Sequence, residues 1–188
     1  MLSPEDRMEE LLGHEAGGCL PDFFHFWGHT AKGTSPVGPW VLSQWWPASF
    51  VVDGTTYFHA EGFMMAAKAR LFGDDSTVKS ILTEENPAVA KKLGRTVSNF
   101  EEHVWAAHRY QFVVDGNVAK FSQSPLLQGY LMSTAPKVLV EASPRDRIWG
   151  IGMGANNPKA VLPSEWRGGN LLGFALVEVR ERLFRVDE

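Results

Sequence analysis

The sequence lacks the features that mark several special classes of protein. Cys19 is the single cysteine among 188 residues, which excludes an intramolecular disulfide framework and fits a reducing compartment. No apolar run reaches the ~18 residues of a membrane-spanning helix. The N-terminal residues 1–7 are too acidic and polar for a signal peptide. We therefore expect a cytoplasmic protein with no membrane partner.

The common motifs of metal, acyl-transfer and phosphate chemistry are absent as well. The chain has no CxxC or HExxH, so we expect no metal site, and it has neither a G-x-S-x-G elbow nor a Walker loop. Gly150, Gly152 and Gly154 alternate, but they do not connect a strand to a helix, so they are weak evidence for a dinucleotide site. The net charge of -4 argues against a broad basic face for nucleic acid and leaves room for a small arginine-lined phosphate pocket. We expect no cofactor.

The signals that are present predict an α+β fold. Hydrophobic residues make up 44% and charged residues 21%, which is typical of a globular domain rather than a disordered chain. Strand patterns occur at residues 23–27, 138–141 and 148–151. Asp53-Gly54 lies between two further β-type runs and is the strongest hairpin signal in the chain.

Helix signals are more numerous than strand signals. Capping residues and apolar periodicity predict helices at about 3–12, 59–72, 74–82, 88–93, 99–112 or onward to 121, 124–132 and 171–184. Gly13 is expected to end the first helix, Asp115-Gly116 to interrupt the fifth, and Asn170 to cap the last, while residues 152–164 form a long loop. We predict a mostly helical single domain with a short β-hairpin and a small sheet. Its boundaries are 21–188, with 1–20 as a peripheral N-terminal segment.

The stretch 57–68 carries the most chemically suggestive pattern. On a helix, Glu61, Met64, Met65 and Lys68 share one face, with a carboxylate and an ammonium at the two ends of an apolar stripe. One interpretation is an amphipathic core helix whose charged ends reach water. The other is an acid/base group and an amine that face one pocket.

A series of segments along the sequence resembles a known family. The ordered segments are LSQWWP (42–47), VDGTTY (52–57), HAEGFMMAAK (59–68), NP (86–87), AKKLGR (90–95), LVEASP (139–144), DRIWGIG (146–152) and WRGGNLLG (166–173). This set is similar to the NADAR, or YbiA-like, family and covers about residues 23–183. No single segment is decisive, but the ordered set is specific.

The resemblance implies an N-glycosidase that cleaves the bond between ribose C1 and a nitrogen base. The implied catalytic residues are Glu61, as acid/base group or oxocarbenium stabiliser, Lys68, as nucleophile or electrostatic partner, and Asp146. Further substrate contacts are expected from aromatic, polar and basic residues, with the arginines on phosphate. These residues are Ser43, Trp45, Tyr57, Arg95, Glu141, Trp149, Gly150, Arg167 and Asn170.

Two substrate classes are associated with the resemblance. One is ADP-ribose attached to guanine, in nucleic acid or as nucleoside, and the other is the aminopyrimidine ribosyl phosphates of early riboflavin synthesis. The YbiA-like branch has an acid after Trp-Gly where this chain has Ile151, which favours ADP-ribosylated guanine. Gly62, Met64 and Met65 replace polar residues of the family motif, so a non-catalytic ADP-ribose or nucleotide-binding module stays as a third hypothesis.

Overall fold

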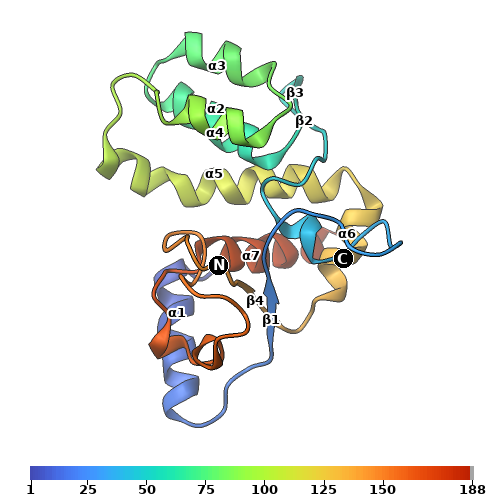
Figure 1. Ribbon diagram of the computed structural model, residues 1–188, viewed down its shortest axis with the longest axis vertical. Coiled ribbons are helices and arrows are strands. Elements are labelled where there is room, and N and C mark those ends of the chain that lie inside the picture. The colour runs from blue at the N-terminus through green and yellow to red at the C-terminus, as the bar shows by residue number, and fades with distance from the viewer. Residues whose placement is uncertain (187–188) are drawn as a thin grey trace. The chain divides into compact units, whose positions relative to one another are not determined.

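A computed structural model describes residues 1–186, and helices dominate it (Figure 1). Seven α-helices and four short strands lie within that range, which confirms the predicted α+β, mostly helical fold. The residues group into two compact units, one built from Met1–Leu42 and the chain from Gly129 onward, the other from Ser43–Gln128. The predicted boundary at residue 20 stays a prediction.

The first unit is built on a two-stranded parallel sheet. Its elements are α1 (Pro4–Ala16), β1 (Phe23–Phe26), the 3-10 helix η1 (Pro39–Leu42), β4 (Val138–Glu141), the 3-10 helices η2 (Pro158–Val161) and η3 (Pro163–Glu165), and α7 (Leu171–Val186). Strand β1 pairs with β4 so that Phe23 lies opposite Val138. Helix α7 packs directly on β4. The two elements approach so closely at Gly173 that a Cβ there would collide with the carbonyl of Leu139.

Helix α1 is longer than predicted. Ser3 and Asp6 form a reciprocal capping box at its start, as the sequence indicates. The helix then continues through Gly13 to Ala16, because no neighbouring atom lies near Gly13 and a glycine in an exposed helix costs only about 1 kcal/mol. Arg7 ties α1 to α7 through a bidentate pair with Glu181, at 2.7 and 3.2 Å.

The second unit is a helical cluster with a hairpin. Its elements are β2 (Phe50–Val52), β3 (Thr55–Tyr57), α2 (Ala60–Leu71), α3 (Asp75–Leu82), α4 (Pro87–Gly94) and α5 (Glu102–Ser122), and α6 (Pro125–Ser133) begins in it and ends in the first unit. Asp53 and Gly54 both have positive φ, 49° and 73°, as a type I′ hairpin turn requires. Helices α3, α4 and α5 all pack on α2, which explains why every residue from Ala60 to Ala69 is buried.

Three other predictions about helices and strands were wrong. Helix α5 begins at Glu102 rather than at residue 99, and it runs unbroken through Gly116. A Cβ at Gly116 would lie 2.6 Å from the ring of Phe63, so this glycine lets α2 and α5 approach each other. Residues 148–151 are not a strand, and η2 and η3 shape the predicted loop 152–164.

Candidate functional site

Glu61 lies in the first turn of α2 with 2% of its surface exposed. Its backbone N–H donates to the carbonyl of Gln44 at 3.0 Å. The N-terminus of a helix carries a partial positive charge, which favours a carboxylate in the first turn. The structure therefore contradicts the interpretation in which the charged ends of this helix reach water.

His59 caps α2 just before Glu61. Its Nδ1 accepts a hydrogen bond from the N–H of Gly62 at 2.8 Å, and the side chain is 1% exposed. Burial lowers the pKa of His59, so the neutral ring that an accepting Nδ1 requires is favoured. A Cβ on Gly62 would lie 3.0 Å from the imidazole, so the glycine at this departure from the family motif makes room for the capping ring.

Lys68 shares the face of Glu61, about 10 Å further along the helix at 1.5 Å per residue. It is 9% exposed, and its Nζ donates to the carbonyl of Gly94, at the end of α4, at 2.8 Å. The same Nζ lies 4.0 Å from the ring centroid of Phe100 and 5.7 Å from that of Trp105. Burial lowers the pKa of Lys68, an effect partly opposed by the carboxylate of Glu102. A lysine of this kind has a larger neutral fraction than an exposed one.

The loop before the hairpin carries two of the predicted substrate contacts. The Oγ of Ser43 accepts from the N–H of Trp45 at 3.1 Å, which fixes the start of a tight turn. The Nζ of Lys91, on α4, lies 5.7 Å from the centroid of the Trp45 ring. Arg95 caps the same helix through its backbone N–H, and its side chain is exposed. Loop and helix thus present an indole and basic groups in one unit.

Tyr57 does not belong to this group. Its ring packs 5.7 Å from that of Phe50 and 5.0 Å from that of Phe63, and its hydroxyl accepts from Arg70 at 2.8 Å. Phe63 is two residues from Glu61, about 200° around the helix, so Tyr57 packs on the other side of α2. There the hairpin, α2 and α5 line a separate hollow of about 740 Å³.

The first unit gathers the other predicted residues. The Oδ1 of Asp146 accepts from the N–H groups of Ile148 and Trp149, both at 2.8 Å, and its own N–H donates to the Oγ of Ser143. These bonds curl the backbone, which explains why no strand forms at 148–151. They also set the direction of the half-buried Trp149.

Asn170 has a different role from the predicted helix cap. Its Oδ1 accepts from the N–H of Glu141 at 2.9 Å, and its Nδ2 donates to the carbonyl of Leu139 at 3.0 Å. The side chain therefore joins α7 to β4 instead of satisfying the first N–H groups of α7. Its φ of 51° lies in the left-handed region, which asparagine tolerates better than most residues.

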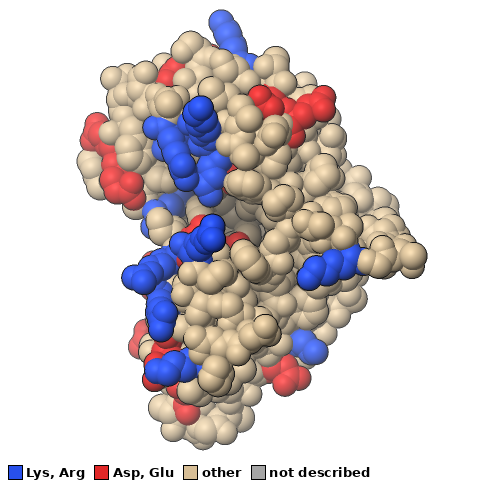
Figure 2. Space-filling model, viewed as in Figure 1, with Lys and Arg blue, Asp and Glu red and all other residues tan. Residues whose placement is uncertain are grey.

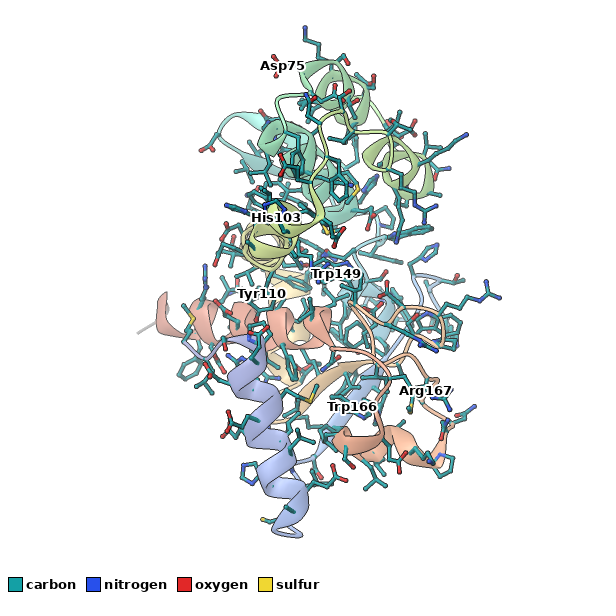
Figure 3. The ribbon with its side chains drawn as sticks, turned by 90° about the vertical axis from the view of Figure 1, so that its left-hand side faces the viewer. Asp75, His103, Tyr110, Trp149, Trp166 and Arg167 are labelled. Atoms are coloured by element: carbon teal, nitrogen blue, oxygen red, sulfur yellow. The ribbon has the colours of Figure 1, made fainter. Side chains whose placement is uncertain are left out.

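Gly150 and Arg167 lie beside this junction. A Cβ on Gly150 would lie 2.8 Å from the carbonyl of Glu141, so only glycine fits without a shift. The N–H of Arg167 donates to the carbonyl of Ile151 at 2.9 Å, and its side chain is exposed at the edge of the unit (Figure 3).

The predicted residues thus form two sets, one in each unit. In the second unit they are Ser43, Trp45, Glu61, Lys68 and Arg95, together with Tyr57 on the other side of α2, and in the first they are Glu141, Asp146, Trp149, Gly150, Arg167 and Asn170. Residues 1–186 contain no group of three or more His, Cys, Asp or Glu side chains placed to hold a metal ion. Within the same range, no helix combines the length and apolar character needed to span a bilayer.

Comparison with known proteins identifies the family. The model of the NADAR domain matches residues 25–184. The chain belongs to the NADAR domain family. It is 40% identical to N-glycosidase R617 of Acanthamoeba polyphaga mimivirus over 164 residues, which cover 85% of this chain and 94% of that protein.

Two other relatives extend this result. N-glycosidase YbiA of Escherichia coli is 33% identical over 73% of this chain and 76% of its own, and its NMR structure superposes with a TM-score of 0.69 at 27% identity, covering 89% and 88% of the two chains. A riboflavin biosynthesis protein of Vibrio vulnificus, VVA0006, is 30% identical over 76% of this chain and 35% of its own. This NADAR domain is an N-glycosyl hydrolase.

One buried polar group of this NADAR domain is not predicted from the sequence. Lys120 is 1% exposed and Asn117 is fully buried, both on α5, and Gln44 is 7% exposed in the loop before α2. The available signal was periodicity, because Asn117 and Lys120 occupy positions on the same helical face as buried Val113 and Phe121. Polar residues at such core-facing positions are worth testing even when no motif includes them.

Proposed function

We propose that this NADAR domain removes ADP-ribose from ADP-ribosylated guanine by hydrolysing the bond between ribose C1 and the base nitrogen. The observation that carries the proposal is the pair of buried ionisable side chains on one face of α2. Glu61 and Lys68 are 2% and 9% exposed, although both residue types are almost never so buried without a reason. A carboxylate and an amine of lowered pKa suit cleavage of a ribosyl C–N bond.

The chemistry follows from where charge develops. As the C–N bond breaks, its electron pair leaves with the base, and positive charge grows on C1 and the ring oxygen. The carboxylate of Glu61 stabilises that charge or delivers the proton that the leaving base takes up. The neutral amine of Lys68 attacks C1, and ring opening with loss of a proton from nitrogen gives a Schiff base. Water then hydrolyses the Schiff base, which releases ADP-ribose and restores the amine.

The substrate preference rests on residue 151. Ile151 is fully buried in a cluster with Val140, Ala142, Met153 and Ala160, so this chain offers no carboxylate where the YbiA-like branch has an acid. On the face drawn in Figure 2, Lys and Arg side chains stand in small groups, some of them beside acidic side chains, and not as one broad basic surface, which fits local phosphate contacts. The roles of Asp146 and the other predicted substrate-binding residues stay predictions.

The aminopyrimidine ribosyl phosphates of riboflavin synthesis are the second candidate. The similarity to VVA0006, whose name places it in riboflavin biosynthesis, is the observation that favours them. A non-catalytic ADP-ribose-binding module is the third.

One assay separates the three. The protein is incubated with ADP-ribosylated guanosine and, separately, with an aminopyrimidine ribosyl phosphate, and base release is followed by chromatography. Faster release from the guanosine substrate supports the proposal. Faster release from the pyrimidine supports the riboflavin role, and ADP-ribose binding without any release supports the non-catalytic module.

The role of Glu61 is tested by Glu61→Gln. We expect kcat to fall by about 10²–10⁴-fold, the usual contribution of a positioned acid or base. Glu5→Gln is the matched control, since Glu5 occupies the first turn of α1 and is exposed. Full activity of Glu61→Gln would show that the carboxylate is not used.

The role of Lys68 has a covalent and a pH readout. Borohydride should trap an adduct with the wild type during turnover, and Lys68→Met should form none. Because the neutral amine is the nucleophile, the rate should rise as pH passes through the pKa of Lys68. Glu102→Gln removes a carboxylate that raises this pKa, so the rising limb should move to lower pH. An unmoved limb would assign the ionisation to another group.

A further inference from the structure

Lys120 is a buried lysine with no part in the chemistry described so far. It lies on α5 with 1% of its surface exposed, among the most enclosed large side chains of the described residues. Its Nζ donates to the carbonyl of Ser43 at 2.9 Å and lies 5.0 Å from the centroid of the Phe121 ring. Burying an amine costs free energy unless it is hydrogen-bonded. The acceptor of its hydrogen bond therefore indicates what Lys120 does in the fold.

Asn117, three residues earlier on the same face of α5, makes a second connection to the same loop. Its Nδ2 donates to the Oε1 of Gln44 at 3.1 Å and to the carbonyl of Val113 at 2.8 Å. Helix α5 therefore hydrogen-bonds to two consecutive loop residues. Lys120 bonds to Ser43, and Asn117 bonds to Gln44.

The same loop is hydrogen-bonded to the start of α2. The carbonyl of Gln44 accepts from the N–H of Glu61 at 3.0 Å, and the Oγ of Ser43 accepts from the N–H of Trp45 at 3.1 Å. A continuous path of hydrogen bonds and short backbone links thus runs from Lys120 through the loop to Glu61. A displacement of the loop would change the position of the Glu61 backbone and of Trp45 together.

We propose that Lys120 is a positioning residue for N-glycoside cleavage, which fixes the loop at Ser43 and thereby the start of α2 that carries Glu61. The proposal rests on the role assigned to Glu61 in the proposed function. Lys120 acts through the backbone carbonyl of Ser43.

The charge of Lys120 makes this role measurable. Burial lowers the pKa of Lys120 to about 7, so its Nζ changes charge in the range where the enzyme is assayed. Around it stand the Ser43 carbonyl from the loop, the ring of Phe121 on its own helix, and His59 before α2. Burial dominates the lowered pKa of His59, the carboxylate of Glu84 opposes it, and the charge of Lys120 adds a smaller lowering effect.

The test compares Lys120→Met and Lys120→Arg with Lys79→Met, a control at an exposed lysine of α3. Base release is measured from pH 6 to 9, and thermal unfolding verifies the fold of each variant. We expect kcat of Lys120→Met to fall at least tenfold and its pH profile to lose an ionisation near 7. Lys120→Arg should recover part of kcat, because a guanidinium still donates, and it too should lack that ionisation.

A purely structural lysine predicts a different result. In that case Lys120→Met would change the unfolding temperature and leave kcat and the pH profile equal to those of Lys79→Met, which would overturn the proposal. If Lys120→Met does not fold, the pH profile of Lys120→Arg decides: an ionisation retained near 7 would overturn the proposal.

An activity-independent readout separates this proposal from the proposed function. Amide hydrogen exchange at Glu61 reports the bond to Gln44, and exchange at Ala66, in the middle of α2, reports the helix as a whole. We expect Lys120→Met to speed exchange at Glu61 at least tenfold more than at Ala66. An equal change at both amides overturns the positioning role even if neither substrate is cleaved.

Discussion

The burial of Lys120 makes a prediction about stability as a function of pH. The perturbation is Lys120→Met, which keeps a flexible side chain of similar length and removes the ionisable group. An unfolded lysine titrates near 10.4, whereas burial lowers the pKa of folded Lys120 to about 7. Between these values the unfolded chain binds a proton that the folded chain does not. The contribution of Lys120 to the stability of the wild type therefore rises with pH across this window.

The magnitude follows from proton linkage. The slope reaches about 1.4 kcal/mol per pH unit when the two states differ by one proton. Integrated from pH 7 to pH 9, with pKa values of about 7 and 10.4, the gain is about 2 kcal/mol. For a protein of this size that corresponds to roughly 4–8 °C in Tm. Below pH 7 both states bind the proton, so the effect levels off.

The assay is urea unfolding of the wild type and Lys120→Met at pH 6, 7, 8 and 9. Other groups titrate in the same range, but they are common to both proteins, so the difference in the free energy of unfolding isolates Lys120. The loss of the bond to Ser43 adds an offset that does not depend on pH. A difference that stays constant within about 0.5 kcal/mol from pH 7 to 9 would show that Lys120 has an ordinary pKa in the folded state.

Two packing predictions follow from contacts of single residues. Gly94→Ala should destabilise the protein by about 1–3 kcal/mol, because the new Cβ would collide with the side chain of Met65, whereas Gly13→Ala, in open space on α1, should stabilise it by about 0.5–1 kcal/mol. Asn170→Ala should cost about 3 kcal/mol or more in urea unfolding, since two backbone groups of β4 lose their partners, and Asn99→Ala, at a similar φ of 54° on the surface, should cost only about 1 kcal/mol. Equal losses at the two asparagines would show that the bonds to β4 add nothing.

Local signals in the sequence predicted most of the fold. The Asp53-Gly54 hairpin, the caps at Asp74 and Asn86, and the strand that pairs as β4 all occur where the pattern indicated. These features depend on backbone chemistry within a few residues, so they can be inferred without the tertiary structure.

The errors have a different origin. The sequence predicts a break at Gly116, but the lack of a side chain there allows contact with Phe63 of another helix. The sequence predicts a helix cap at Asn170, but its side-chain amide bonds to a strand 29 residues away in the sequence. In both cases a distant element determines the role of a residue whose local meaning is ambiguous, and one sequence does not show that partner.

The candidate site was predictable only where local spacing in the sequence determines it. Glu61 and Lys68 stand at helical spacing in a recognisable motif, so their shared face could be inferred before the structure. Their burial could not, because it depends on α3, α4 and α5 covering α2 on several sides. Lys120 was missed because its meaning depends on a loop 77 residues away in the sequence.

The buried lysines of α2 and α5, Lys68 and Lys120, link stability to function. Replacing a buried ion pair by apolar residues of similar volume is often neutral or stabilising, so the burial of Lys68 and Lys120 is by itself weak evidence that these amines serve stability. Each amine nevertheless donates to a backbone carbonyl, Gly94 at the end of α4 and Ser43 in the loop before α2. The Gly94 carbonyl directly precedes the predicted residue Arg95, and the second carbonyl belongs to the predicted residue Ser43, one residue before Gln44, the partner of Glu61. Both buried amines therefore hold segments that carry predicted site residues. This arrangement is expected if the two lysines are kept for catalysis and not for stability.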